Sequence, residues 1–195
     1  MSPSNRKKTE LKITGFGGQG VILSTLIIGK AASIFDNQYA TMIQSFGPEA
    51  RGGACNAQLI ISDEPIMYPY VVQPDILVVM SQEAYTRFAP ELNPDGLLIY
   101  EESLVTLDDQ VTVPKERQFK IPATKLAEEL GRKIVLNIVM VGFFTAVSKL
   151  IGLKAMRKAV ESSVPHGTET LNIHAFNKGY KFGKALLKEK DLTVA

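Results

Sequence analysis

The sequence is poor in the residues that hold metals and carry out catalysis. Among its 195 residues Cys55 is the single cysteine, and the histidines are His166 and His174. One cysteine excludes an internal disulfide, and it cannot by itself hold an iron–sulfur cluster or a structural zinc. We therefore expect no metal ligands and no catalytic residues on this chain, and we interpret Cys55 as a small apolar residue of a strand.

Long apolar runs and common catalytic motifs are also missing. The stretch from Ile134 to Val147 is interrupted by Asn137 and is too short to span a bilayer. The N-terminal MSPSNRKKTELK lacks the apolar segment of a secretory signal, and neither G-x-S-x-G nor H-E-x-x-H occurs. The acidic pairs Glu101–Glu102 and Asp108–Asp109 are expected to be solvated loop charges. These absences favour a cytoplasmic protein without a complete active site.

Charge is distributed unevenly along the chain. Residues 1–114 carry 7 lysines and arginines against 13 acidic residues, whereas residues 115–195 carry 15 against 7. Such a split is typical of a surface that meets another chain or an anionic ligand, and a solvated basic helix face is the simpler alternative. Because the basic residues are not interleaved with aromatic ones, nothing indicates a nucleic-acid partner.

Apolar runs separated by turn residues indicate alternating strands and helices. We expect strands over residues 11–16, 38–44, 54–62, 75–80, 97–101 and 118–121. Helices are expected over residues 20–35, 123–130, 134–151, 154–162 and 172–190, with Ser81 as the N-cap of a further helix. The pattern predicts the α/β class, as a three-layer Rossmann-like domain with a mainly parallel sheet and a helical C-terminal portion. One domain is expected over residues 11–190, behind a polar tail of residues 1–10.

The segment ITGFGGQGVILSTL joins the first expected strand to the first expected helix through a glycine-rich turn. Gly15, Gly17 and Gly20 match G-x-G-x-x-G, which brings amide groups close to a phosphate at the positive end of a helix. A dinucleotide site also needs an acidic residue at the end of the second strand, where this chain has Gln44. The turn therefore indicates an anion site, or a packing turn that binds nothing, more than an NAD(P) or flavin site.

Two further loops are expected at the same edge, because ligands of such sheets bind beyond the carboxyl ends of the strands. In SFGPEARGG, residues 45–53, Arg51 suits a phosphate, a carboxylate or an acidic residue of a partner. An ion pair between Arg51 and Glu49 that merely orders the loop is the alternative. The other loop is SQEA, residues 81–84.

The glycine turn, GFGGQGV at 15–21, and QSFGPEARGG at 44–53 together resemble the gamma subunit of 2-oxoacid:ferredoxin oxidoreductases. DILVVMSQEAYTRF, NPDGLLIY, PATKLAEELG and NIVMVGFFTAV are similar as well, although Phe143 and Phe144 are larger than expected after Gly142. The resemblance covers nearly the whole chain. It implies a non-catalytic subunit of an assembly that oxidises a 2-oxoacid with coenzyme A to an acyl-CoA and carbon dioxide, and reduces ferredoxin.

The resemblance also implies partners and cofactors. Alpha and beta subunits, with a delta subunit left open, would carry thiamine diphosphate, Mg²⁺ and [4Fe-4S] clusters, and this chain would contribute coenzyme A binding and subunit packing. The loop form GPEARGG is more similar to 2-oxoglutarate-type members than to pyruvate-type members. Pyruvate, branched-chain oxoacids and indolepyruvate stay open as substrates, as does a purely structural docking subunit. Neither a membrane nor a nucleic acid is an expected partner.

Coenzyme A carries a pyrophosphate and a ribose phosphate, so its site needs amide donors and cations. We predict that it is bound by Gly17, Gly18, Gln19 and Gly20 of the turn and by Ser45, Gly47, Arg51, Ser81 and Gln82 of the neighbouring loops. The basic face of residues 172–190 is expected to meet an acidic surface of a partner subunit or of ferredoxin. Its lysines are Lys178, Lys181, Lys184 and Lys188.

Overall fold

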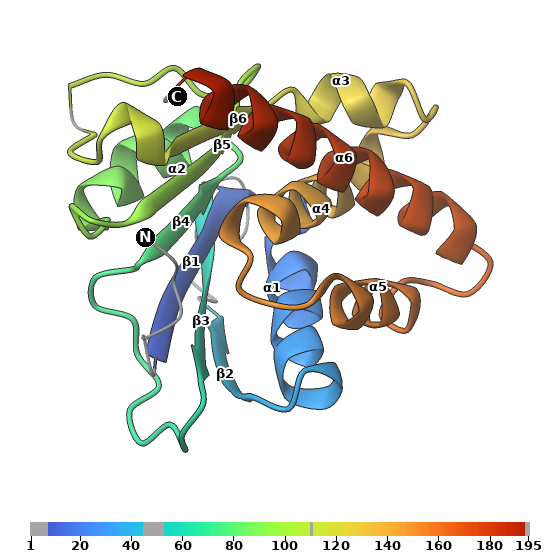
Figure 1. Cartoon of the computed structure of the whole chain (residues 1–195), viewed down its shortest axis with the longest axis horizontal. Coiled ribbons are helices and arrows are strands. Elements are labelled where there is room, and N and C mark those ends of the chain that lie inside the picture. The colour runs from blue at the N-terminus through green and yellow to red at the C-terminus, as the bar shows by residue number, and fades with distance from the viewer. Residues whose placement is uncertain (1–7, 45–52, 110, 194–195) are drawn as a thin grey trace.

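A computed structural model describes residues 8–44, 53–109 and 111–193 (Figure 1). Its strands are β1 (Lys8–Phe16), β2 (Tyr39–Gln44), β3 (Ala54–Ser62), β4 (Ile76–Val79), β5 (Leu97–Glu101) and β6 (Gln118–Ile121). They form one sheet in the order β2-β3-β1-β4-β5-β6. The pairs β1–β4, β4–β5 and β5–β6 are parallel, whereas β3 lies antiparallel between β1 and β2. Since β3 alone runs against the others, the predicted mainly parallel sheet is confirmed.

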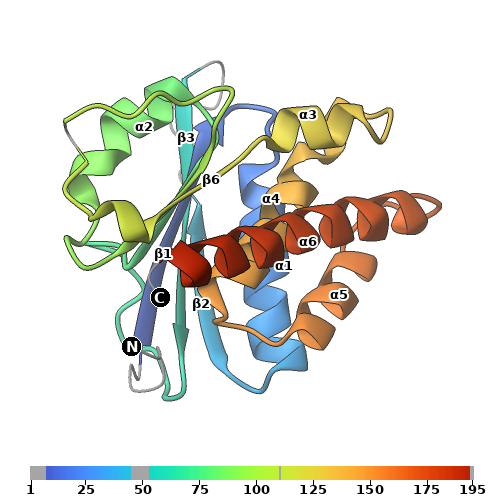
Figure 2. The same cartoon turned by 45° about the horizontal axis from the view of Figure 1, so that its top comes forward.

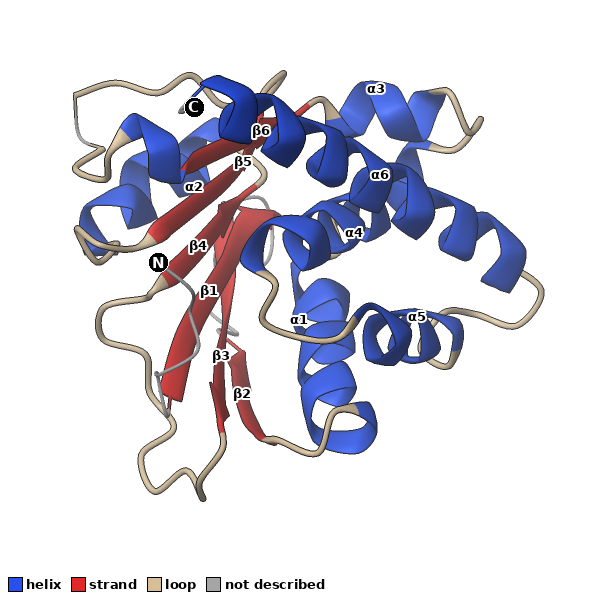
Figure 3. Cartoon of the chain, in the orientation of Figure 1, coloured by secondary structure: helices blue, strands red, loops and turns tan. Residues whose placement is uncertain are grey.

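Helices cover both faces of this sheet, which gives the three predicted layers (Figure 2). One face carries α2 (Gln82–Phe88), which the short 3-10 turn η3 (Ala89–Glu91) continues. The other face carries α1 (Val21–Lys30), α3 (Ala123–Glu128), α4 (Leu136–Ser148), α5 (Leu153–Glu161) and α6 (Glu169–Thr193). From α3 onward the described chain is helical, as predicted (Figure 3). No described helix has the length and apolar character that crossing a membrane requires.

The strand β4 shows how the sequence builds two cores. Successive side chains of a strand point to opposite faces, and all four residues of β4 are buried. Ile76 and Val78 pack in the core beneath α1 and α4, while Leu77 and Val79 pack in the core beneath α2. A continuous apolar run such as DILVVM is therefore typical of a central strand with helices on both sides.

Two predicted helices are not α-helical over their whole expected range. The helix expected over residues 20–35 is α-helical to Lys30 and then becomes the π-helix η1 (Ala31–Phe35). The helix expected over residues 134–151 begins with the 3-10 turn η5 (Lys133–Val135) and ends at Ser148, because Lys149 takes a left-handed conformation with φ 52°. Past that stop, the Asp36 carboxylate accepts a hydrogen bond of 3.1 Å from the Gly152 amide. This bond joins the end of η1 to the start of α5.

The helices α4 and α6 cross in direct backbone contact. A Cβ atom added to Gly142 would overlap the carbonyl oxygen of Phe176, and one added to Gly179 would overlap that of Val139. Beside this crossing, Phe143 and Phe144 are both almost fully buried. The large residues after Gly142 are therefore part of the core, and the glycines are what brings the two helices together.

The residues of the two acidic pairs, all expected to be solvated, differ in their exposure. Glu102 and Asp109 are exposed, as predicted, but Glu101 is fully buried, so the prediction was wrong for it. Glu101 is the last residue of β5 and lies on the same face as the core residue Ile99, since the side-chain period of a strand is two. Asp108 is exposed, yet its carboxylate accepts a hydrogen bond of 2.6 Å from the buried Tyr85 hydroxyl.

Candidate functional site

The glycine turn, residues 15–20, lies at the edge of the sheet where β1 and β4 end. Thr14 pairs with Val79, so the residues that follow β1 and β4 leave the sheet side by side. The Gln19 Nε2 donates a hydrogen bond of 2.8 Å to the carbonyl oxygen of Met80, directly before Ser81. The structure thus brings the turn together with the loop that contains Ser81 and Gln82, as the sequence predicted.

The second predicted loop begins and ends near the same edge. Phe16 at the end of β1 pairs with Ala54, and Gln44 at the end of β2 pairs with Ala57. The candidate residues Ser45, Gly47 and Arg51 lie outside the described residues, so their roles remain predictions.

Left-handed backbone conformations explain two of the glycines in the turn. Gly18 has φ 93° and Gly20 has φ 74°, a region that favours glycine. A Cβ atom on Gly20 would lie 2.5 Å from Nδ2 of Asn137, whereas one on Gly18 would have no other heavy atom within 4 Å. Packing therefore requires glycine at position 20, while the Cβ position of Gly18 is open among the residues that the structure describes.

The side chain of Gln19 holds the turn in place. Its Oε1 accepts a hydrogen bond of 2.6 Å from the Phe16 amide, and its own backbone amide donates one of 3.1 Å to the Phe16 carbonyl. Together with the bond to Met80, these contacts tie the turn to β1 and β4. In this conformation Gln19 positions the neighbouring backbone amides, and one hydrogen of its side-chain amide is used within the protein.

The N-terminus of α1 has the electrostatics of an anion site. The helix begins directly after Gly20, has no side-chain cap, and has no acidic residue in its first turn. The amides of a first helical turn have no partner within the helix and carry partial positive charge. No carboxylate within the first turn neutralises this helix end, and a helix end of this kind favours an anion such as a phosphate.

Ser81 and Gln82 fix the neighbouring loops. The Ser81 hydroxyl oxygen accepts a hydrogen bond of 3.3 Å from the Ala84 amide, which confirms it as the N-cap of α2. The Gln82 side chain accepts a hydrogen bond of 2.7 Å from the Thr106 amide and donates one of 3.2 Å to the Thr106 carbonyl. These bonds attach the start of α2 to the loop after β5. Contact of either residue with a ligand stays a prediction.

Sequence reasoning missed two polar residues near this edge. Asn137, at the start of α4, is buried against Gly20. The sequence signal that could have found it was a single polar side chain within an otherwise apolar run. Glu101 accepts a hydrogen bond of 3.1 Å from the Thr124 amide at the start of α3. Its other carboxylate oxygen and the Thr124 hydroxyl are buried without a hydrogen-bond partner. The alternation of LLIYE was the signal for Glu101, because it places this residue on the core side.

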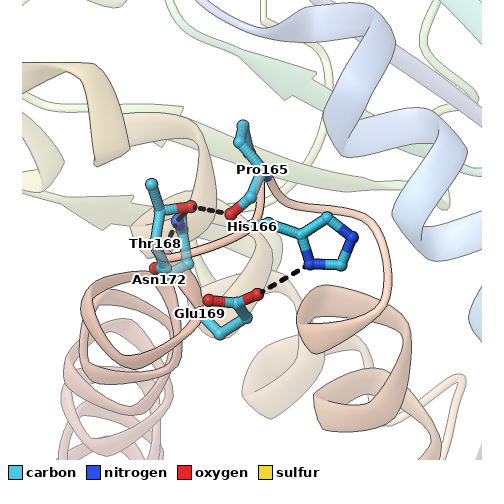
Figure 4. Close-up of polar contacts among 5 residues, drawn as sticks. All are labelled: Pro165, His166, Thr168, Glu169 and Asn172. Atoms are coloured by element: carbon cyan, nitrogen blue, oxygen red, sulfur yellow. Dashed lines mark hydrogen bonds and ion pairs between the residues drawn. The ribbon is translucent and has the colours of Figure 1, made fainter.

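The histidines belong to no catalytic cluster in the described part of the chain. His166 lies before α6, and its Nδ1 is 3.4 Å from a carboxylate oxygen of Glu169 (Figure 4). Beside it, the Thr168 hydroxyl donates a hydrogen bond of 2.7 Å to the Pro165 carbonyl. A hydrogen bond from the backbone amide of Glu169 lowers the pKa of the Glu169 carboxyl group, and the neighbouring His166 lowers it further. A carboxylate in the first turn stabilises the positive end of a helix, so this group of residues caps α6. His174 is exposed on α6.

Metal-binding and reactive groups are scarce in the residues that the structure describes. Among them, no three histidine, cysteine, aspartate or glutamate side chains gather as metal ligands. Cys55 is half-buried in β3 and packs against the main core, as predicted, and burial raises the pKa of its thiol. A raised pKa disfavours the reactive thiolate.

A cavity of about 450 Å³ lies away from the glycine turn, between α1, η1, β2, β3 and the end of α5. Leu26, Ile34 and Met42 contribute to its apolar wall. At its rim, Lys30 donates a hydrogen bond of 2.8 Å to the Ser162 carbonyl. No residue of the glycine turn lines this cavity.

The fold and the glycine turn define the class: a three-layer α/β protein with a glycine turn and an uncapped helix N-terminus at the carboxyl edge of its sheet. The model of the pyruvate ferredoxin/flavodoxin oxidoreductase family matches residues 10–182. The chain belongs to this family.

Two relatives show where the chain lies within the family. The 2-oxoglutarate synthase subunit KorC of Methanocaldococcus jannaschii is 44% identical over 93% of this chain and 97% of the relative. The pyruvate synthase subunit PorC of Methanothermobacter marburgensis is 32% identical over 88% of this chain and 96% of the relative.

Two solved structures share the fold. The gamma subunit of a keto/oxoacid ferredoxin oxidoreductase from Geobacter sulfurreducens has a TM-score of 0.81 and 34% identity, over 92% of this chain and 98% of that one. The predicted resemblance to gamma subunits is thereby confirmed. The 2-oxoglutarate:ferredoxin oxidoreductase from Magnetococcus marinus has a TM-score of 0.80 at 21% identity, over 93% of this chain but 32% of that chain. There the fold forms about a third of a longer polypeptide.

Proposed function

We propose that this chain is the cytoplasmic gamma subunit of a 2-oxoglutarate:ferredoxin oxidoreductase, in which it contributes coenzyme A binding and subunit packing. The complex converts 2-oxoglutarate, coenzyme A and oxidised ferredoxin into succinyl-CoA, carbon dioxide and reduced ferredoxin. The higher identity to a KorC subunit, 44% against 32% for a PorC subunit, supports this substrate. Pyruvate, a branched-chain oxoacid and indolepyruvate are the alternatives.

The observation that carries coenzyme A binding is the uncapped N-terminus of α1 behind the open side of Gly18. Phosphates of coenzyme A placed there would accept hydrogen bonds from backbone amides and lie at the positive end of the helix. The Magnetococcus marinus enzyme of the same fold was solved with coenzyme A and succinyl-CoA bound, which supports a site for this ligand in the assembly.

The cofactors are proposed to sit on the partner subunits. Thiamine diphosphate with Mg²⁺ supplies the carbanion chemistry of decarboxylation, and [4Fe-4S] clusters carry electrons to ferredoxin. Cluster ligation needs several cysteines, whereas this chain has Cys55 alone. We therefore assign alpha and beta subunits as its partners, with a delta subunit left open.

The test is a Gly18→Val variant in the purified complex, with Gly167→Val as the matched control. Gly167 has φ 84° and an equally open environment in the loop before α6, so both variants suffer the same kind of backbone strain. We expect Gly18→Val to raise the KM for coenzyme A about tenfold, equivalent to about 1.4 kcal/mol, with thiamine content unchanged. The control should leave this KM unchanged.

The assay follows coenzyme A-dependent reduction of viologen with a panel of 2-oxoacids. Highest kcat/KM with 2-oxoglutarate supports the substrate assignment, and highest kcat/KM with pyruvate overturns it. An unchanged KM for coenzyme A in the Gly18→Val complex removes the glycine turn from the coenzyme A site, although the subunit assignment would stand.

The second candidate function is that of a purely structural docking subunit. The packing of glycines inside the turn favours this candidate. Gly20 is required by its contact with Asn137, and a Cβ atom on Gly15 would lie 2.7 Å from Oε1 of Gln19. These glycines would be needed even if the turn bound nothing. Calorimetric titration of the intact complex with coenzyme A separates the candidates, because a docking turn predicts equal affinity for the wild-type and Gly18→Val complexes.

A further inference from the structure

Large apolar side chains are exposed in one short stretch of the chain and on the strand beside it. We name the group formed by Tyr39, Met67, Tyr68, Tyr70 and Val72 the tyrosine surface. These residues expose 50%, 92%, 58%, 54% and 74% of their surface, respectively. Single exposed apolar residues are common, but contiguous groups mark interaction sites.

The connection between β3 and β4, which presents most of this surface, is held against the sheet. The Val71 amide donates a hydrogen bond of 2.9 Å to Oε1 of Gln58, and the Val71 side chain is buried. The rings of Tyr68 and Tyr70 lie 5.4 Å apart. Fixing Val71 on β3 therefore presents its neighbours to solvent in a defined arrangement, which lowers the entropy cost of binding.

Tyr39 lies on the same side of the sheet as this connection. It pairs with Ser62, the last residue of β3, from which the connection starts. Ser62 and Gln58 point to the same face because they are four residues apart in a strand, and the side chain of Tyr39, paired with Ser62, points there too. The tyrosine surface therefore includes residues of the edge strand β2 and of the connection on one side of the sheet.

The helix α2 does not reach this part of the face. The core beneath α2 includes Ala54 at the far end of β3 but no residue of β2. The connection leaves β3 at the opposite edge of the sheet from the glycine turn, near the lower end of β1 in Figure 1. A partner bound to the tyrosine surface would thus leave the candidate coenzyme A site accessible.

We propose that the tyrosine surface docks a different subunit of the same assembly, one that offers an apolar recess bordered by lysine or arginine. This inference rests on the proposed function. Tyrosine and methionine are enriched at protein interfaces, and the exposed Asp63, which begins the connection, gives the surface an acidic border. Charge complementarity therefore calls for a basic border on the partner.

Two observations favour a different subunit over a second copy of this chain. A two-fold contact between copies would repeat the same acidic border on both sides, which is unfavourable. In the Magnetococcus marinus structure the matched fold covers 32% of the chain, so about twice its own length of further polypeptide accompanies it there.

The experiment measures the Kd between the purified full-length chain and its purified alpha and beta subunits. Tyr68→Asp and Val72→Asp place a charge in the middle of the surface, and Ile134→Asp places one on a side chain that is 81% exposed elsewhere. We expect each of the first two to raise the Kd at least about 30-fold, as for a central interface residue, and the control to change it less than about threefold. Because all three side chains are exposed, circular dichroism and the unfolding midpoint should match the wild type.

The outcomes separate this inference from the proposed function. If the wild-type chain binds the two subunits and both variants bind as tightly, the docking surface is wrong while the proposed function stands. A wild-type chain that binds neither subunit overturns the proposed function itself. If light scattering shows a wild-type dimer that Tyr68→Asp makes monomeric, a second copy is the occupant and the proposal is overturned.

Discussion

At the residue scale, Tyr85 makes the stability of the core beneath α2 depend on pH. It is fully buried, its hydroxyl donates a hydrogen bond to the Asp108 carboxylate, and it accepts one of 3.0 Å from the Asp108 amide. Burial, reinforced by the bond to Asp108, raises the pKa of Tyr85 to about 12. The ordinary pKa of tyrosine, which applies to the unfolded chain, is about 10. The stabilisation is therefore complete below pH 10 and is lost as the pH rises toward 12.

Replacing Tyr85 with phenylalanine should remove this pH dependence. We expect Tyr85→Phe to lower the free energy of unfolding by about 1–2 kcal/mol at pH 8, because the Asp108 carboxylate loses its donor. The difference from wild type should shrink as the pH is raised from 10 to 12. Urea unfolding at several pH values measures it, with Tyr68→Phe, at a tyrosine that is 58% exposed, as the control. A difference that stays constant up to pH 12 would contradict the raised pKa.

The sequence predicted which residues gather at the candidate site better than it predicted what their side chains do. The glycine pattern and the expected N-cap placed the turn and Ser81 correctly at one edge. The contact of Gln19 with Met80 joins residues 61 positions apart, and no local pattern encodes it. The same is true of Asn137 against Gly20, which depends on how α4 packs against the turn.

At the scale of elements, the crossing of α4 and α6 depends on two glycines. We expect Gly179→Ala to lower the free energy of unfolding by about 1–3 kcal/mol, since its Cβ atom would overlap the Val139 carbonyl and force the helices apart. Gly29→Ala is the control: its Cβ atom would meet the side chain of Leu59, 3.1 Å from Cδ1, and no backbone atom, and alanine favours a helix. Thermal unfolding measures both variants. Equal stability of the two would show that α4 and α6 need no glycine to approach.

The C-terminal part of α6 is attached to β6 by Lys190. Its ammonium group donates hydrogen bonds to the carbonyls of Lys115, Glu116 and Gln118 and lies 3.8 Å from the centroid of the Phe119 ring. Burial holds the pKa of Lys190 below its ordinary value.

Replacing Lys190 should loosen this attachment. We expect Lys190→Met to destabilise the protein by about 1–2 kcal/mol, because it loses the hydrogen bonds and the cation–π contact but keeps the apolar stem. Hydrogen exchange should become faster in the last turns of α6, and the exposed neighbour Lys188, changed to methionine, is the control. Unaltered exchange in Lys190→Met would mean that the apolar face of α6 alone holds this end.

Elements with strong local patterns were predicted almost to the residue, whereas their pairing was not. The predicted strand over residues 118–121 coincides with β6, and that over 54–62 with β3. The antiparallel position of β3 between β1 and β2 did not follow from its apolar pattern, because alternation fixes the face of a strand and not its neighbours. The end of α4 was missed for a similar reason, since the left-handed conformation of Lys149 has no glycine to signal it.

At the scale of the whole molecule, three surfaces face different directions. The glycine turn lies at the carboxyl edge of the sheet, and the tyrosine surface begins at the opposite edge. The helix α6, which contains the basic lysines, lies on the face of the sheet opposite α2 (Figure 2). Separate surfaces would allow a ligand and more than one partner to bind the chain at the same time, which agrees with the proposed function.

The basic face of α6 is smaller than its sequence indicated. Lys178 forms an ion pair of 2.6 Å with Glu129, so part of its charge is neutralised within the chain. Lys181 and Lys184 are exposed, as is Lys188 one turn further along. The predicted interaction with an acidic surface therefore concerns these three lysines.

Reversing two of these charges tests that interaction. We expect Lys181→Glu/Lys184→Glu to raise the Kd for the partner subunits, or the KM for ferredoxin, about tenfold at low ionic strength, with a smaller effect at high salt because exposed charges are screened. Lys154→Glu/Arg157→Glu on α5 makes the same change of charge at exposed residues and is the control. If both double variants behave alike at every salt concentration, the net charge of the chain governs association, and the face of α6 has no specific partner.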